Sequence, residues 1–321
     1  MTTTAIEWTD HTVQPGIFGC SIKSEACRFC YAAVMARRQE FMAAARGDVS
    51  PYAGTTQVVN GVVQFNGVVR TDAARIGPAF AALPKRAAAG HAFVTSMADV
   101  FHEKVPDDYI AEVFGELAVI HAESTLDPST RRAPYRIRNA ARAAHAYQVL
   151  TKRIERARNL LGSAAFVAAV ASAACRRAYN RYPASQLYDE IATHRHGQLW
   201  PLPNVWIGAT IEDEKTAPTR SRALAATPAV VRFASCEPLL GDIAEILAPQ
   251  LGATIGWVIV GCESRGGRPG RPTDLEWVRR LRDASARAGA AFFLKQLAID
   301  GAVVGLPALD GATHAAFPVV T

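Results

Sequence analysis

The sequence has few charged and aromatic residues and no long apolar run. Charged residues make up 20% of the 321 positions and aromatic residues 8%, yet half of the chain is apolar, which excludes wholesale disorder. The most membrane-like run, residues 160–175, has 16 residues, fewer than the about 20 that cross a bilayer. Met1 to Asp10 is polar and shows no signal peptide. We therefore expect a cytoplasmic protein with no membrane partner.

Neither a linker nor a low-complexity tract divides the chain, so we predict one domain over residues 1–321. The net charge of +6 is uneven, because the basic segment 131–158 holds nine Lys or Arg and one acid, a local charge of +8. Such a segment is typical of a nucleic-acid footprint, and equally of a solvated Arg/Ala helix. Charge alone leaves both interpretations open.

Short apolar runs alternate with helical stretches after residue 90, which favours an α/β barrel or a doubly wound sheet. Helices are expected at 31–45, 106–121, 154–179 and 274–288. Two Asn-Gly pairs between β-branched residues predict a β-hairpin insertion at about 55–70. The expected strands are 5–8, 92–95, 147–150, 205–208, 230–233, 257–260 and 291–294.

Polar side chains follow six of these strands, where the mouth of a barrel would place an active site. Loops are polar in general, but Glu, Lys, Arg and Cys are not the usual loop residues. We therefore predict a site formed by these strand ends. Its candidates are Ser96, Asp99, Thr151, Lys152, Arg153, Thr210, Glu212, Glu237, Cys262, Glu263 and Lys295.

Three of the six cysteines, Cys20, Cys27 and Cys30, lie within eleven residues, in a loop spanning 10–31. Three thiolates on one loop suit a [4Fe-4S] cluster with one iron left open. They also suit a Cys3His zinc site with His11 as the fourth ligand. Structural zinc ligands usually come as two close pairs, which this loop lacks, and a zinc knuckle does not explain the polar strand ends.

In combination, these motifs resemble a phage-associated three-Cys-motif family of unknown function, itself similar to a divergent branch of the radical S-adenosylmethionine (SAM) enzymes. The resemblance covers residues 5 to about 297. It implies a partial or full (β/α) TIM-like barrel of the radical SAM type. The stretches that carry it are 6–10, the three cysteines with Tyr31, 96–103, 150–153, 237–241, 261–264 and 292–296.

The resemblance also implies roles for the candidate residues. Cys20, Cys27 and Cys30 would hold the cluster, with Phe29 near the adenine of SAM and Tyr31 beside it. Two features depart from the superfamily pattern: six residues rather than three separate Cys20 from Cys27, and Ser96 to Asp99 replaces the usual Gly-Gly-Glu.

Further roles follow for the other candidates. Ser96 or Asp99 would bind the SAM amino group. Thr151, Lys152 and Arg153 would bind its carboxylate or a phosphate. Thr210 and Glu212 would complete the cofactor site, while Glu237, Glu263, Lys295 and Cys262 would face the substrate. Cys262 could donate a hydrogen atom to a substrate radical, or it could simply be a small buried residue.

The resulting expectation is a radical SAM-type isomerase or lyase, reduced by a donor such as flavodoxin or ferredoxin. Its [4Fe-4S] cluster and SAM would abstract hydrogen from a nucleic-acid base or nucleotide. The family suggests a thymine derivative in phage DNA, hence host cytoplasm. The alternative is a zinc-stapled, non-enzymatic nucleic-acid-binding protein.

Overall fold

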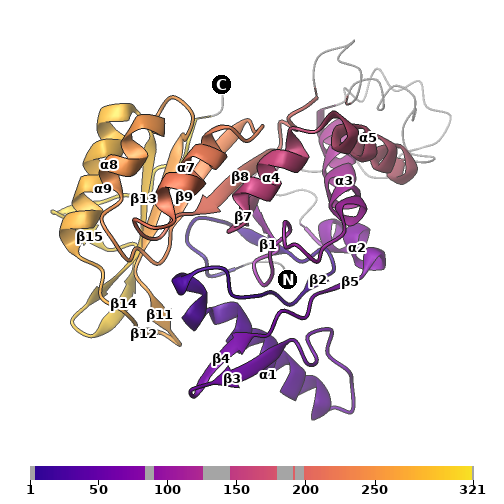
Figure 1. Cartoon of the computed structure of the whole chain (residues 1–321), viewed down its shortest axis with the longest axis horizontal. Helices are drawn as coiled ribbons and strands as arrows, with labels where there is room; N and C mark the ends of the chain where they lie inside the picture. Colours follow the sequence, from indigo (N-terminus) through magenta and orange to yellow (C-terminus); the bar gives the residue numbers. More distant parts are fainter. Residues whose placement is uncertain (1–3, 84–89, 126–144, 179–190, 192–198, 320–321) are drawn as a thin grey trace.

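A computed structural model describes residues 4–83, 90–125, 145–178, 191 and 199–319. Its centre is a curled sheet of eight strands in the order β1-β6-β7-β8-β9-β10-β13-β14. Seven strands run parallel and β14 is antiparallel to β13. No pairing among the described residues joins β14 to β1, so the sheet is a half-barrel (Figure 1). The strands are β1 (His11–Val13), β6 (His91–Val94), β7 (Ala146–Thr151), β8 (Val205–Thr210), β9 (Val231–Cys236), β10 (Trp257–Gly261), β13 (Ala291–Ile299) and β14 (Ala302–Gly305).

The six strands expected after residue 90 are confirmed, but the expected strand at 5–8 is wrong. Thr9 N–H donates to the Ile6 carbonyl at 3.2 Å and closes a turn there. The Trp8 ring points into the sheet, 4.9 Å from the Phe93 ring and 6.2 Å from Phe233. Trp8 therefore fills the half-barrel from its concave side, and β1 begins only at His11.

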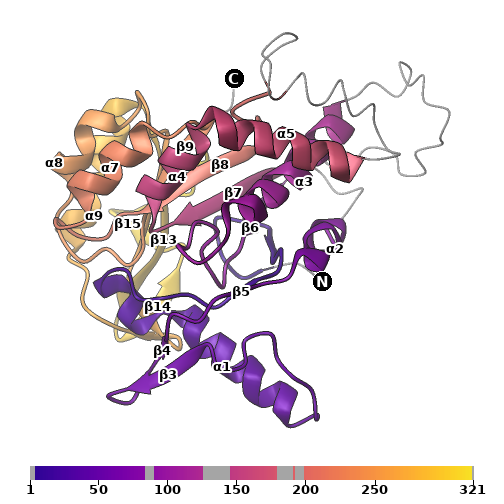
Figure 2. The same cartoon turned by 45° about the vertical axis from the view of Figure 1, so that its right-hand side comes forward.

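Helices connect the parallel strands and cover the outer side of the sheet. Helices α3 to α5 lie beside β6–β8, and α7 to α9 lie beside β9–β13 (Figures 1 and 2). The larger apolar core lies between these helices and the outward-facing strand residues. The helices are α2 (Ile76–Ala81), α3 (Asp107–Thr125), α4 (Ile154–Leu161), α5 (Ala164–Ala178), α7 (Ala217–Ala225), α8 (Ala244–Leu247) and α9 (Leu275–Ala288), with short 3-10 helices η1 (Glu25–Phe29), η2 (Ala73–Arg75) and η4 (Ala248–Gln250).

The single helix expected at 154–179 is wrong, because the chain breaks between α4 and α5. The two helices meet at 77°. Ser163 Oγ accepts a hydrogen bond from Phe166 N–H at 3.4 Å and begins the second helix. None of the described helices is by itself long and apolar enough to cross a membrane, although α4 and α5 together would meet that length and composition.

A small unit beside the sheet contains the predicted hairpin. Strands β3 (Thr56–Val59) and β4 (Val62–Phe65) pair antiparallel and pack on the alanine face of α1 (Tyr31–Ala44), with Phe65 buried there. Asn60 and Gly61 form the turn with φ of 49° and 76°, as an Asn-Gly hairpin turn requires. This unit lies below the sheet in Figure 1. The remaining short strands are β2 (Ile17–Phe18), β5 (Arg70–Thr71), β11 (Ser264–Arg265), β12 (Arg268–Pro269), β15 (Ala308–Leu309) and β16 (Ala312–Thr313).

Aromatic rings fill the concave side of the half-barrel. Trp8, Trp206, Phe233 and Trp257 belong to one buried cluster. The Phe233 ring lies directly over Gly208, where a Cβ would come within 2.3 Å of it. This aromatic floor closes the concave side of the sheet from below, and the carboxyl ends of the strands are where parallel barrels place their active sites.

Candidate functional site

The cysteine loop reaches the carboxyl end of the sheet. Gly19 forms a parallel bridge to Ala98, just beyond β6, so that Cys20 follows at the strand ends. The loop then forms η1, and Cys30 is the residue that precedes the first turn of α1. All three cysteines are free and half-buried. Their charges interact, since both Cys27 and Cys30 contribute to the raised pKa of Cys20.

Burial favours the protonated form of Cys20 and Cys30. It raises the pKa of Cys20 to about 12; the Asp99 charge adds to the effect and the Arg153 charge opposes it. Burial also raises the pKa of Cys30, opposed by the Lys152 charge and by the amides of Ala32 and Ala33 at the start of α1. A bound metal centre would displace these protons, because only thiolates are ligands.

The zinc and cluster interpretations require different spacings of the three sulfurs. In the described ranges, no three His, Cys, Asp or Glu side chains are grouped closely enough to hold a metal ion as they stand. Two sulfurs on one zinc ion would lie about 3.8 Å apart, given tetrahedral Zn–S bonds of about 2.3 Å. His11 lies at the start of β1, at the opposite edge of the sheet from the strand ends, with its ring 5.6 Å from that of His145. In a [4Fe-4S] cluster each cysteine binds a different iron, so its sulfurs stay further apart.

Asp99 joins the ends of β6 and β7. Its Oδ1 accepts from Thr151 Oγ1 at 2.7 Å and from Phe101 N–H at 3.0 Å. Its Oδ2 accepts from Lys152 N–H at 3.1 Å and from Arg153 Nη1 at 2.9 Å. The predicted candidates Asp99, Thr151 and Arg153 therefore come together, bonded to one another.

Arg153 is buried and connects Asp99 to the cysteine loop. Its Nη1 lies 3.9 Å from Cys20 Sγ and its Nη2 donates to Ser21 Oγ at 2.8 Å. Its Nε pairs with Glu103 at 2.5 Å. Burial would lower the pKa of this guanidinium, but the Asp99 and Cys20 charges and the pairing with Glu103 raise it further above its usual value.

Glu212, at the end of β8, holds the cysteine loop from the other side. Its carboxylate is fully buried and pairs with Arg220 Nη1 at 2.5 Å. It also accepts a hydrogen bond from Ser24 Oγ, on the cysteine loop. Thr210 contributes its carbonyl, which accepts from the same Arg220 at 2.7 Å.

Glu237 and Lys295 form an ion pair of 2.7 Å at the ends of β9 and β13. Burial would lower the pKa of Lys295, but the charges of Glu237 and Glu7 raise it above its usual value. Cys262 is buried next to this pair, and burial raises its pKa. Burial of the Tyr31 hydroxyl, with the charges of Cys30 and Glu237 adding to it, raises the pKa of Tyr31. The Tyr31 hydroxyl donates to the Ser96 carbonyl at 2.6 Å.

Glu263 follows the end of β10 and pairs with two arginines. It accepts from Arg265 Nη2 at 3.0 Å and from Arg271 N–H at 2.9 Å, and it also pairs with the Arg271 guanidinium. Burial would raise the pKa of Glu263, but these hydrogen bonds lower it. Arg265 lies 3.4 Å from the centroid of the Phe29 ring, so one face of Phe29 is covered by a guanidinium.

A family model matches residues 3–127 and 125–318, nearly the whole chain. The chain belongs to DUF5131, a family of proteins of unknown function. No curated protein and no solved structure matches it.

Several site residues of this DUF5131 protein escaped the sequence analysis. Ser21, Ser24, Arg220 and Arg271 connect the cysteine loop or the strand-end carboxylates to the rest of the site. A sequence signal existed only for Ser21 and Ser24, which lie between the cysteines. Half of the basic segment 131–158, residues 131–144, lies outside the described residues.

Proposed function

We propose that this DUF5131 protein is a radical SAM-type enzyme whose cysteine loop holds a [4Fe-4S] cluster. One observation carries the proposal. Three interacting thiols lie on a single loop at the carboxyl ends of a parallel half-barrel, beside buried polar side chains that are held in place by one another. Parallel barrels place active sites at this end.

Cys20, Cys27 and Cys30 would hold the cluster, which, with SAM bound, supplies a carbon radical able to take a hydrogen atom from a substrate. Neighbouring cations and amides partly offset the effect of burial on these thiols. The Arg153 guanidinium lies beside Cys20, the Lys152 charge lowers the pKa of Cys30, and the Cys27 sulfur accepts from Lys23 N–H at 3.5 Å. Cations and amide donors stabilise anionic sulfur.

The remaining residues would position the substrate and move its protons. Lys295 keeps a proton on Nζ, paired with Glu237, so this pair offers both a hydrogen-bond donor and an acceptor at the strand ends. The aromatic floor around Trp257 and Phe233 closes the site from below and keeps water from a reactive intermediate.

For the substrate we propose a nucleic-acid base or nucleotide, with a thymine derivative in phage DNA as the leading case. The support is the similarity of the motifs and the positive charge of the chain. The reaction would then be a rearrangement or a bond cleavage, with flavodoxin or ferredoxin as electron donor and the cytoplasm of the phage host as its place.

The test is the metal content of protein purified without oxygen. We expect about four irons and four sulfides per chain and a brown colour. The reduced protein should then convert SAM into 5′-deoxyadenosine. Cys27→Ala should lose both properties, whereas Cys175→Ala, on α5, should keep them. One zinc per chain without sulfide would overturn the proposal in favour of a zinc-stapled binding protein.

A further inference from the structure

Four arginines from three separate segments gather beside the cysteine loop. We call Arg28, Arg265, Arg268 and Arg271 the arginine rim. Three of the guanidiniums surround Phe29, with central carbons 5.4, 3.4 and 5.6 Å from its ring centroid for Arg28, Arg265 and Arg271. Arg268 lies directly opposite Arg265 in the β11–β12 pair, so these two side chains share one face of the hairpin.

The carboxylates nearby do not balance this charge. Glu263 is bonded by both Arg265 and Arg271, and Glu25 lies 3.9 Å from Arg271. Arg28 and Arg268 form no ion pair with any residue in the described parts of the chain, and both are exposed. Like charges directly opposite each other destabilise a strand pair unless an anion lies between them. Arginine forks are also well suited to phosphate oxygens.

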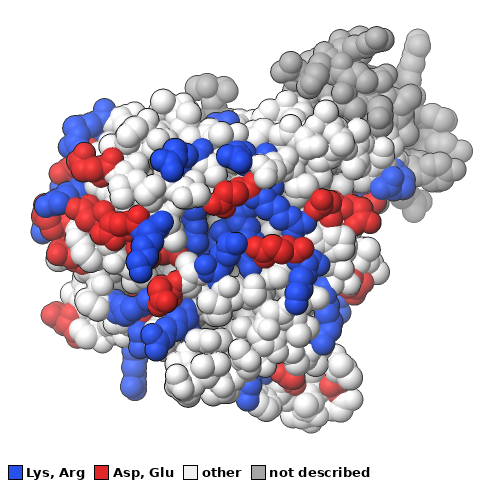
Figure 3. All heavy atoms as spheres, viewed as in Figure 1, with Lys and Arg blue, Asp and Glu red and all other residues white. Residues whose placement is uncertain are grey.

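The rim borders the mouth rather than a distant surface. Arg271 Nη2 donates to the Glu25 carbonyl at 3.1 Å, which connects the rim to the cysteine loop. Glu263, at the end of β10, is the carboxylate that holds it to the sheet. In Figure 3 basic side chains gather over β11 and β12 and continue across the centre of this face.

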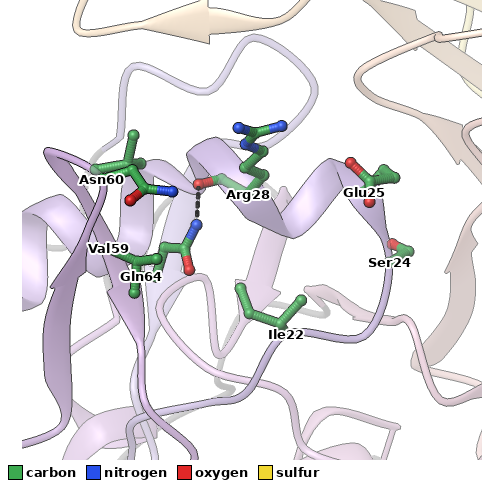
Figure 4. A pocket seen from close by; sticks show the side chains of 8 residues that line it. Ile22, Ser24, Glu25, Arg28, Val59, Asn60 and Gln64 are labelled. Atoms are coloured by element: carbon green, nitrogen blue, oxygen red, sulfur yellow. Dashed lines mark hydrogen bonds between the residues drawn. The ribbon is translucent and has the colours of Figure 1, made fainter.

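A pocket of about 290 Å³ adjoins the rim between η1 and the β3–β4 hairpin (Figure 4). Ile22, Val59 and Val62 give it apolar walls, while Asn60 and Gln64 contribute amides. Ser24, Glu25 and Arg28 complete the lining, and the Glu25 carboxylate lies 3.9 Å from Arg271. Gln64 Nε2 donates to the Arg28 carbonyl at 3.3 Å, which leaves its Oε1 as an acceptor. Apolar walls with amide donors and acceptors are typical of a site for a flat nucleobase.

We propose that the arginine rim and this pocket bind a single-stranded segment of DNA, with its phosphates on the arginines and one unstacked base between η1 and the hairpin. The inference rests on the proposed function for the identity of the polymer. A reaction on a base requires that the base leave the stack, and a groove with basic side chains next to a base pocket holds such a strand.

The experiment measures fluorescence anisotropy of a labelled single-stranded oligonucleotide against the full-length holoprotein over a salt series. The double variant R28A/R268A should bind at least tenfold more weakly. The slope of log K against log salt should fall by about 1.4, since each lost phosphate contact contributes about 0.7 on a single strand. R28K/R268K should recover much of the affinity, and the same oligonucleotide as a duplex should bind more weakly.

The matched control is R222A/R287A, which removes the same charge from exposed positions on α7 and α9. Equal affinity of the R28A/R268A and control variants would overturn the inference, as would equal affinity for duplex and single strand. The two proposals fail separately. A protein that cleaves SAM but binds DNA without the rim contradicts only this inference. A protein without iron that binds DNA through the rim contradicts only the proposed enzyme.

Discussion

The Arg153 guanidinium lies 3.9 Å from the sulfur of Cys20 and 2.9 Å from the Asp99 carboxylate. Both partners are far away in the sequence, and Arg153 and Asp99 are buried while Cys20 is half-buried. The first cysteine is therefore positioned by the end of β7, through a buried ion pair. The position of the cysteine loop therefore depends on this ion pair at the edge of the sheet.

Removing the Arg153 charge should destabilise the protein strongly. Arg153→Met leaves Asp99 buried without its cation, a change that costs roughly 3–5 kcal/mol in comparable cases. Urea unfolding of the protein should measure this loss, and its iron content should fall as well. Arg153→Lys, which keeps the charge but not the fork, should lose less. Arg158→Met, on an exposed position of α4, serves as the control and should leave both quantities unchanged.

His102 should make the stability depend on pH. Its Nδ1 accepts from Lys104 N–H at 3.1 Å, so Nε2 carries the proton and donates to Ser21 Oγ at 2.8 Å. Burial and the Arg153 charge lower its pKa from 6.5 to about 4, despite the opposing Glu103 and Asp99 charges. The unfolded chain thus binds an extra proton between these pH values, and stability should decrease as the pH falls through them.

This change in the pKa of His102 corresponds to roughly 3 kcal/mol in the free energy of unfolding. Melting temperatures between about pH 7.5 and pH 4 should show it. His102→Gln keeps a donor for Ser21 but does not titrate, so its melting temperature should decrease less over the same range. Identical pH profiles for both proteins would show that His102 does not contribute.

The Lys295–Glu237 pair should behave as one unit. Lys295→Met alone leaves Glu237, which is 13% exposed, without its cation, and Glu237→Gln alone leaves Lys295 in the same situation. The two single losses in the free energy of unfolding should therefore add up to more than the loss in the double variant. A double-mutant cycle in urea measures the coupling; additive effects would mean that the two charges are solvated independently. If the pair positions substrate, each single variant should also raise KM.

Much of the sheet could be predicted because each buried parallel strand is a continuous apolar run, whatever the rest of the chain does. The same rule failed at 5–8, where Trp8 and Ile6 pack on the concave side instead of the segment pairing with a strand. The hydrophobic pattern of a segment indicates that it is buried, but it does not indicate which other segment it packs against. At the α4–α5 break the sequence did carry a signal, because Gly162 is a poor helix former and Ser163 a common N-cap, but the apolar pattern continues across both.

Many residues of the candidate site could be predicted from the sequence, but the hydrogen bonds and ion pairs between them could not. Glu212 and Asp99 follow strands, and this placed them correctly at the carboxyl edge. The partners of Glu212, Arg220 and Ser24, could not be found, because such pairs form between segments that only the folded chain brings together. The arginine rim is the clearest case, since its members come from η1, from the β11–β12 hairpin and from the turn after it.

Gly208→Ala should test the aromatic floor. The new Cβ would lie 2.3 Å from the Phe233 ring, so the ring or β8 must move, and overpacking of this kind costs typically about 1–3 kcal/mol. Gly256→Ala is the matched control, because its Cβ would meet nothing within 4 Å. Phe233→Leu should relieve part of the clash when combined with Gly208→Ala. Urea midpoints should therefore fall for Gly208→Ala and not for Gly256→Ala. Equal midpoints for these two variants would mean that the Phe233 ring does not lie on β8 in solution, and the closed floor of the site would be wrong.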